Sequence, residues 1–361
     1  MHPKLLDKLA KRQSNGTFRA LLNLESYIDF YSNDYLGYAC DENTTVSISG
    51  STGSRLISGN SDQAEKCEVF LSNHFRSESA LVFNSGYAAN LGLLSSIPQR
   101  GDIILYDERI HASAKEGIRL SFADSFSFKH HDYEDLERQL NKFSHKLVYV
   151  VVEALYSMDG TMAHFRRLTN LCSDYQANLI VDEAHSAGVF GEEGRGVVAA
   201  MDLENQVFAR LVTFGKAYGI MGAAILGSQN LRNYLINFAR SFIYTTALPP
   251  EIYAIIHRNV GSENIELRLT KLHENIAYFR SAFNHSACVS EINSPIQIIQ
   301  FGDINKTKQL SEILLENRLA VKPIFSPTVP EGSECLRICL HSFDQKSDID
   351  QLIEVLKSEL V

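Results

Sequence analysis

Short apolar runs recur through the middle of the chain, and each ends in polar and then small residues. They lie at residues 79–83, 102–106, 146–152, 179–182 and 211–213. Such runs, flanked by glycine and by helical segments, are typical of strands buried on both faces of a parallel sheet. The alternation of strands and helices from about residue 79 to 227 therefore predicts an α/β fold with a mostly parallel sheet and right-handed crossovers.

The pattern changes after residue 227. A helical segment at 231–242 is followed by a break at Thr245–Pro250, and a long helix is predicted over 251–283. Beyond it, alternating strand and helix patterns predict a smaller α+β domain. We therefore expect an N-terminal arm at 1–35, a large domain at 36–240 and a small C-terminal domain at 241–361.

Chemically useful side chains follow two of the predicted strands. Asp182 and His185 come after one strand, and Thr213 and Lys216 after the next. Ligands of open α/β sheets bind beyond the carboxyl ends of the strands, where these residues would meet. A lysine among glycines facing an aspartate suits pyridoxal phosphate, because the lysine forms the Schiff base and the carboxylate keeps the ring nitrogen protonated. Each residue alone is more often a surface lysine or a helix-capping aspartate, but the combination favours the cofactor site.

Two glycine-containing loops are further candidates. Gly86 and Tyr87 lie where a strand and a small-residue turn lead into a helix, which is a natural seat for a phosphate because free amides and the helix dipole face an anion. An ordinary βα turn has the same pattern. The loop Gly50–Gly59 lacks the Gly-Lys-Ser/Thr ending of a phosphate-binding P-loop. Alone, it fits any flexible loop.

Composition excludes several classes of function. The net charge of -9 and the absence of a basic run argue against a nucleic-acid surface. The longest apolar runs are far shorter than the ~20 residues of a membrane span, and Met1–Arg12 lacks the apolar core of a signal peptide. The six cysteines form no CxxC pair, which suits reduced thiols in a cytoplasmic enzyme and offers no metal site.

Four motifs resemble those of the α-oxoamine synthases, a group of fold-type I pyridoxal phosphate enzymes. They are Ser32–Gly37, Ser157–Gly160, Val181–His185 and Thr213–Gly219, and they match in order and spacing over nearly the whole chain. The resemblance implies a large cofactor-binding domain, a smaller C-terminal domain and a homodimer with shared active sites.

The resemblance also implies roles for individual residues. Lys216 would be the Schiff-base lysine and the acid/base, Asp182 would pair with the ring nitrogen, and His111 would stack on the ring and contact substrate. The other implied cofactor contacts are Gly86, Tyr87, Ser157, His185, Thr213, Thr245 and Thr246, the last two reaching across to the partner subunit's phosphate. Arg19 and Arg337 would hold substrate carboxylates through their planar forks.

The chemistry implied is a decarboxylative condensation of an amino acid with an acyl thioester. The stretches 238–246 and 327–330 favour L-alanine and a pimeloyl thioester. A sister synthase using glycine or serine with another acyl-coenzyme A, an aminotransferase, and a non-catalytic protein of the same fold are the alternatives. Ala64 and Thr161 depart from the family pattern, and Arg55 is our candidate for the wall of the donor channel.

Overall fold

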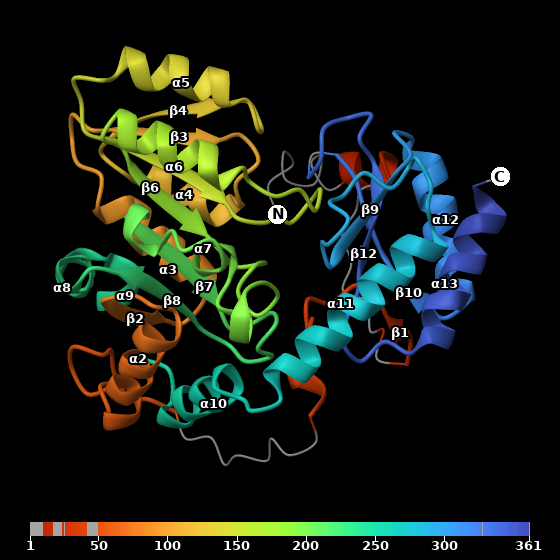
Figure 1. The fold of residues 1–361 in the computed structure, drawn as a ribbon, viewed down its shortest axis with the longest axis horizontal. Helices are drawn as coiled ribbons and strands as arrows, with labels where there is room; N and C mark the ends of the chain where they lie inside the picture. The colour runs from red at the N-terminus through yellow and green to blue at the C-terminus, as the bar shows by residue number, and fades with distance from the viewer. Residues whose placement is uncertain (1–9, 17–23, 25, 42–49, 327, 361) are drawn as a thin grey trace.

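The computed structural model describes residues 10–16, 24, 26–41, 50–326 and 328–360. Its larger part is built on a seven-stranded sheet (Figure 1). In sheet order the strands are β2 (Ser79–Phe83), β8 (Ala223–Gly227), β7 (Ala209–Thr213), β6 (Asn178–Asp182), β5 (Val148–Glu153), β3 (Ile103–Asp107) and β4 (Asp124–Phe128). β8 runs antiparallel to the other six strands, which all share one direction, so the prediction of a mostly parallel sheet is confirmed.

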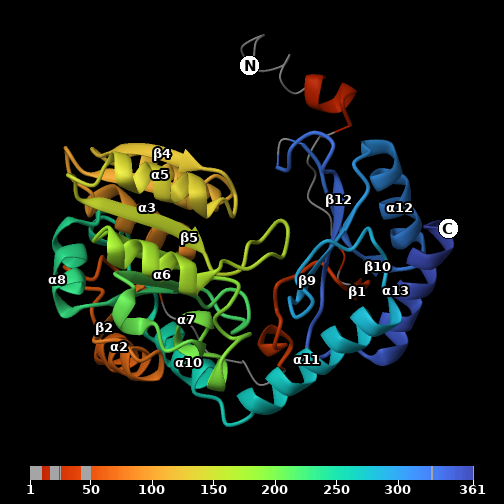
Figure 2. The same ribbon diagram turned by 45° about the horizontal axis from the view of Figure 1, so that its top comes forward.

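Helices cover both faces of this sheet, as its buried strands require. Figures 1 and 2 show α3 (Gly86–Ser96) and α4 (Ala112–Arg119) on one face and α5 (Tyr133–Lys142) and α6 (Phe165–Asp174) on the other. Near the β2 edge, α2 (Asp62–His74) packs against α10 (Pro250–Val260), and α8 (Gln229–Phe238) and α9 (Arg240–Ile243) pack against α3. The short segments are η1 (Tyr38–Cys40), η2 (Glu192–Gly194), α7 (Val197–Ala200) and η3 (Glu204–Gln206).

The order of the strands reverses between β3 and β5. From β3 the chain crosses to β4 at one edge of the sheet, and from β5 it proceeds through β6 in the opposite direction. The crossover helices therefore lie on opposite faces on the two sides of this point, which leaves a crevice at the carboxyl ends of the strands.

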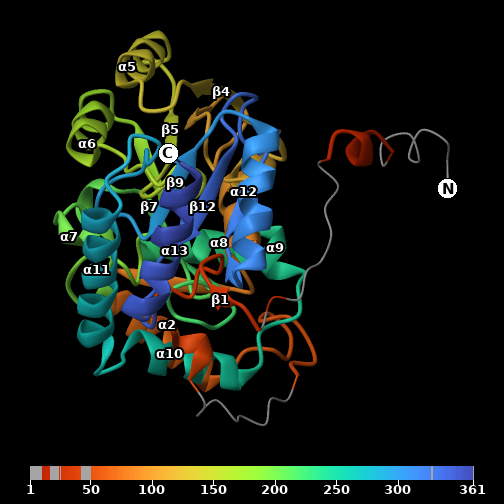
Figure 3. The same ribbon diagram turned by 90° about the vertical axis from the view of Figure 1, so that its right-hand side faces the viewer.

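The small domain has a three-stranded antiparallel sheet in the order β11 (Lys322–Ile324), β12 (Cys335–Cys339) and β9 (Ile296–Gln300). Figure 3 shows α11 (Ile265–Ala282), α13 (Lys346–Glu359) and α12 (Ile304–Glu316) side by side over it. The N-terminal strand β1 (Ile28–Asp29) pairs in parallel with β10 (Leu319–Ala320). Residues from near the two ends of the chain are thus held in one unit.

The prediction of one long helix over 251–283 is wrong, because this segment forms two helices. The first, α10, ends after Val260 with Gly261 as the C-cap, and α11 begins at Ile265 after a turn through 262–264. Glycine loses more conformational freedom in a helix than other residues, which favours the break here. Since α10 packs against α2, we propose that the domain boundary lies between α10 and α11 rather than at residue 241.

The apolar core is extensive and reaches into both domains. One cluster of buried side chains joins α2 and β2 of the large domain to α11, α12 and α13 of the small domain, and a second fills the rest of the large domain. In the part of the chain that the structure describes, no helix has the length and apolar character to cross a membrane.

Candidate active site

A cavity of about 180 Å³ opens at the carboxyl ends of the parallel strands. It contains seven of the residues that the sequence predicted: Gly86, Tyr87, His111, Asp182, His185, Thr213 and Lys216. Asn90, Ser113, Glu153, Ala184 and Leu211 complete its lining. Ser157, Thr245, Thr246 and Arg337 are not among the lining residues, and Arg19 lies outside the described residues.

Asp182 is the last residue of β6, and two donors hold its carboxylate. The amide of Asn90 in α3 donates to Oδ2 at 2.8 Å, and the backbone amide of Ala184 donates to Oδ1 at 2.9 Å. Asn90 also donates to Ser113 Oγ at 3.0 Å. These two hydrogen bonds fix the orientation of a buried carboxyl group beside the cavity.

Lys216 follows β7 and lies in the same cavity as Asp182. Burial lowers the pKa of its ammonium to about 8, although the carboxyl groups of Asp182 and Glu153 act in the opposite direction. A lysine with a pKa near 8 is partly neutral at physiological pH and can serve as a nucleophile and a base.

The N-terminus of α3 forms one wall of the cavity. Ser85 caps this helix by accepting from the amide of Ala88 at 3.1 Å. At Gly86, a side-chain Cβ would lie 3.7 Å from the Thr213 side chain, so the backbone approaches the hydroxyl closely. The first amides of a helix have no carbonyl partner within it and attract an anion.

The two histidines of the cavity are both weak bases. Burial lowers the pKa of His111, whose Nδ1 is 2.7 Å from Ser113 Oγ. Burial lowers the pKa of His185 much further, and its Nδ1 shares a hydrogen bond of 2.8 Å with the Tyr35 hydroxyl. The Tyr35 hydroxyl has one proton, which it donates to Asn33 Oδ1 at 3.1 Å. In that arrangement His185 Nδ1 donates to the Tyr35 oxygen, and Nε2 of the neutral ring is an acceptor.

Arg337 reaches the edge of the site from β12 of the small domain. Its guanidinium is buried and donates to the carbonyl of Ser157 at 2.7 Å and to Asn33 Oδ1 at 2.9 Å. Asn33 Oδ1 also accepts from the Tyr35 hydroxyl at 3.1 Å. These bonds link the small domain, through Tyr35, to His185.

Thr245 and Thr246 lie just beyond α9, near the N-terminal end of α3. The carbonyl of Thr246 accepts from Asn84 Nδ2 at 2.8 Å, two residues before Gly86. Their predicted role across a subunit interface stays a prediction. Arg55, in contrast, is paired with Glu68 at 2.8 Å inside the large domain, so it does not offer a free cation to a substrate.

Sequence reasoning did not select Glu153, Asn90 or Ser113. Glu153 was visible as the polar residue that ends the apolar strand 148–153, the same signal that selected Asp182. Asn90 lies one turn into α3 and Ser113 two residues after His111, so only the packing of α3 on α4 brings them to Asp182.

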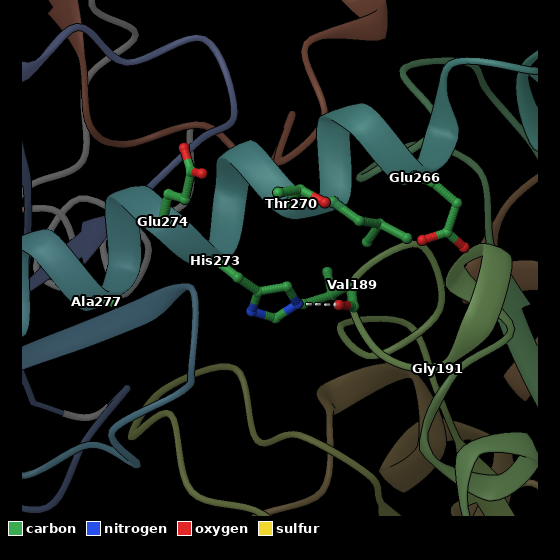
Figure 4. Close-up of a pocket in the computed structure, with 8 residues that line it drawn as sticks. Val189, Gly191, Glu266, Thr270, His273, Glu274 and Ala277 are labelled. Atoms are coloured by element: carbon green, nitrogen blue, oxygen red, sulfur yellow. Dashed lines mark hydrogen bonds between the residues drawn. The ribbon is translucent and has the colours of Figure 1, made fainter.

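A second cavity, of about 490 Å³, lies along α11 (Figure 4). His273 donates from Nε2 to the carbonyl of Val189 at 2.9 Å, and the exposed Glu266 and Glu274 lie on the same helix. This cavity contains none of the residues that line the first one. It therefore takes no part in the chemistry considered below.

The residues of the first cavity fit pyridoxal phosphate. Lys216 can form the covalent link, Asp182 provides a fixed negative charge for the ring nitrogen, and the α3 N-terminus with Thr213 provides donors for the phosphate. His111 can supply a ring face, and His185 can supply a ring nitrogen for a hydrogen bond. No part of this donor set requires a metal.

Comparison with known proteins supports the same conclusion. The family model for class I and II aminotransferases matches residues 25–356. The chain is 36% identical over 398 residues to the 8-amino-7-oxononanoate synthase of Emericella nidulans, covering 100% of this chain and 96% of that protein.

Two solved structures share the fold. An 8-amino-7-oxononanoate synthase from Francisella tularensis has a TM-score of 0.80 at 30% identity and covers 93% of this chain and 98% of its own. A serine palmitoyltransferase variant from S. paucimobilis, solved with a bound PLP–myriocin aldimine, has a TM-score of 0.90 at 23% identity and covers 99% and 96% of the two chains. The resemblance seen in the four motifs is confirmed: the chain belongs to the class I and II aminotransferase family and, within it, to the pyridoxal phosphate-dependent α-oxoamine synthases.

Proposed function

We propose that the protein condenses L-alanine with a pimeloyl thioester, with loss of carbon dioxide, to give 8-amino-7-oxononanoate, a step of biotin synthesis. The observation that carries this proposal is the full-length match at 36% identity to a relative of that name, together with a cavity that has the residues for the chemistry. The two stretches 238–246 and 327–330 motivated the same choice of substrates.

Bound pyridoxal phosphate would supply the electron sink that stabilises negative charge at the amino-acid α-carbon. The protein's own side chains provide the charge that faces the ring nitrogen and the base that moves the proton. Asp182 is held in place by Asn90 and Ala184, so its carboxylate is oriented before reaction and needs no reorganisation. Lys216, with its pKa lowered to about 8, can take a proton from the substrate α-carbon and return it.

Arg337 is our proposed anchor for a substrate carboxylate. Its guanidinium is buried and its orientation is fixed by Ser157 and Asn33. A planar fork held in this way suits bidentate pairing with a carboxylate. Counting the bond from Nη1 to Cys339 Sγ, three of its five N–H groups have protein acceptors, and the other two can bind a substrate.

We further propose a homodimer whose active sites are completed across the interface. Apolar side chains are exposed around the cavity and the glycine loop, as is common at interfaces between subunits. They are Leu56, Ile57, Tyr87, Met221 and Tyr244. Thr245 and Thr246 adjoin this surface. The predicted cytoplasmic location stays a prediction.

The test is thiol release by purified protein from acetyl, succinyl, pimeloyl and palmitoyl thioesters, each with alanine, glycine or serine. We expect pimeloyl with alanine to give the highest kcat/KM. Some turnover of glycine is expected, because one methyl group in an apolar pocket discriminates by only ~1–3 kcal/mol. A tenfold preference for acetyl with glycine, or for palmitoyl with serine, would replace this proposal with a sister synthase.

A further inference from the structure

Two carboxyl groups stand side by side at the floor of the active-site cavity. Glu153 ends β5, Asp182 ends β6, and the two residues are register partners in the parallel pairing of these strands. Adjacent strands are ~4.8 Å apart, and paired positions point to the same face. Both side chains are buried and both line the cavity. Like charges this close cannot both form readily.

The hydrogen bonds decide which of the two carries the charge. Asp182 accepts from Asn90 at 2.8 Å and from the amide of Ala184 at 2.9 Å. Glu153 Oε2 accepts a long bond of 3.4 Å from the amide of Ser157, with the amide of His111 as a further weak donor to the carboxyl group, and Oε1 is buried with no hydrogen-bond partner among the described residues. Donors favour the ionised form, and a buried carboxylate oxygen without one is costly. The proton therefore belongs on Glu153.

The charged and titratable groups around Glu153 agree with this assignment. Burial, followed by the charge of Asp182, raises the pKa of Glu153 to about 8, against the opposing effect of Lys216 and of the amides of Ser157 and His111. The pKa values of His111 and His185, on the other walls of the cavity, are lowered, so neither is a cation at neutral pH. Lys216 is the cation that acts on Glu153, and the charge of Arg337 acts in turn on Lys216, where it lowers the pKa.

We propose that Glu153 is a positioning residue, protonated at neutral pH, that keeps Asp182, Glu153 and Lys216 together at zero net charge and leaves Lys216 able to lose its proton. The inference rests on the proposed function of Lys216 as a base. An ionised Glu153 would add a second negative charge beside the ammonium and hold its proton more tightly. When Glu153 is neutral, no second carboxylate opposes the effect of burial, which lowers the pKa of Lys216.

The direct test is infrared spectroscopy of the full-length, cofactor-free protein labelled with ¹³C-glutamate. The difference spectrum against unlabelled protein should show a protonated glutamate side chain at pH 6–7 that titrates with a midpoint near 8. Asp344, whose pKa is also raised, is silent with this label. Glu153→Gln should remove the band, whereas Glu137→Gln, at an exposed position of α5, should leave it.

A second variant keeps the test decisive if Glu153→Gln folds poorly. Asp182→Asn removes the neighbouring charge, so the midpoint of the glutamate band should move to lower pH. The absence of the band in the wild type, its persistence in Glu153→Gln, or an unmoved midpoint in Asp182→Asn overturns the inference. The infrared titration contains no substrate, so its outcome does not depend on the thiol-release assay with different thioesters. If one of the two experiments fails, the result of the other can still be interpreted.

Discussion

The ion pair between Arg210 and Glu183 gives the sharpest stability prediction. Arg210 lies in β7, and Glu183 directly follows Asp182. Their side chains are 3% and 0% exposed, and Arg210 Nη2 is 2.6 Å from Glu183 Oε2. The same guanidinium donates to the carbonyls of Phe75 at 2.7 Å and Arg195 at 2.8 Å. We consider Arg210→Met, which keeps an unbranched apolar stem and removes the guanidinium and its charge.

The magnitude follows from what the substitution leaves behind. Removing one partner of a buried ion pair costs about 3–5 kcal/mol, because the other charge stays buried. Glu183 Oε1 keeps its bonds from Ser186 Oγ at 2.9 Å and the amide of Val198 at 3.1 Å, which limits the loss. Each carbonyl that loses its donor adds ~1 kcal/mol. We therefore expect a loss near the upper end of ~3–5 kcal/mol, a large share of the ~5–15 kcal/mol typical of a domain.

The assay is urea unfolding of cofactor-free protein followed by far-ultraviolet circular dichroism, since the chain has no tryptophan. A lower midpoint at an unchanged slope reports the loss of stability. Lys271→Met is the matched control, because Lys271 pairs with Glu274 at 3.8 Å on the exposed side of α11 and such surface pairs contribute ~0–1 kcal/mol. If Arg210→Met lost no more stability than Lys271→Met, the reasoning on the buried pair would be refuted.

Three further outcomes are expected. Asp182→Asn should lower kcat by at least ~10²–10³ with the cofactor still bound, because it removes a fixed charge and keeps the shape; turnover within a few-fold of wild type would contradict this. Sedimentation should show a dimer, and alanine substitutions at Thr245 and Thr246 should weaken cofactor binding; an active monomer would contradict the shared site. Burial lowers the pKa of His130, but hydrogen bonds to Asp107 and Asp159 outweigh this and raise it to about 9. Its contribution to stability should therefore be full below the unfolded pKa of ~6.5 and lost as the pH rises through 9, and His130→Asn should abolish that dependence in urea unfolding.

The strands could be predicted because burial on both faces leaves a clear pattern. The apolar run at 79–83 coincides with β2, and the other runs fall within a few residues of their strands. The antiparallel direction of β8 could not be predicted, since Ala223–Gly227 is a short run of small and apolar residues that looks the same in either direction. The break between α10 and α11 was missed because the apolar periodicity continues on both sides of Gly261.

The site was predictable to the extent that its residues follow strands. Parallel strands end at one edge, so polar residues after separate strands must meet there, and Asp182 and Lys216 do. Contacts that depend on packing between distant segments leave no such signal. Tyr35 and His185 are 150 residues apart in the chain. Their hydrogen bond depends on how the N-terminal segment, which pairs through β1 with β10 of the small domain, is placed against the large domain.

Charge placement links the stability of this fold to its chemistry. Burying a carboxylate or a guanidinium is costly, and three buried charged residues beside the site have specific partners: Asp182 has Asn90, Glu183 has Arg210, and Arg337 has Asn33. Glu153 is the acid whose second oxygen has no such partner, so the fold favours its neutral form. The apolar core shared by both domains offsets these costs, and it holds the charges where solvent cannot screen them. Substitutions at Glu183 or Arg210 should therefore act first on folding, whereas those at Asp182 or Glu153 should act on proton transfer in a folded protein.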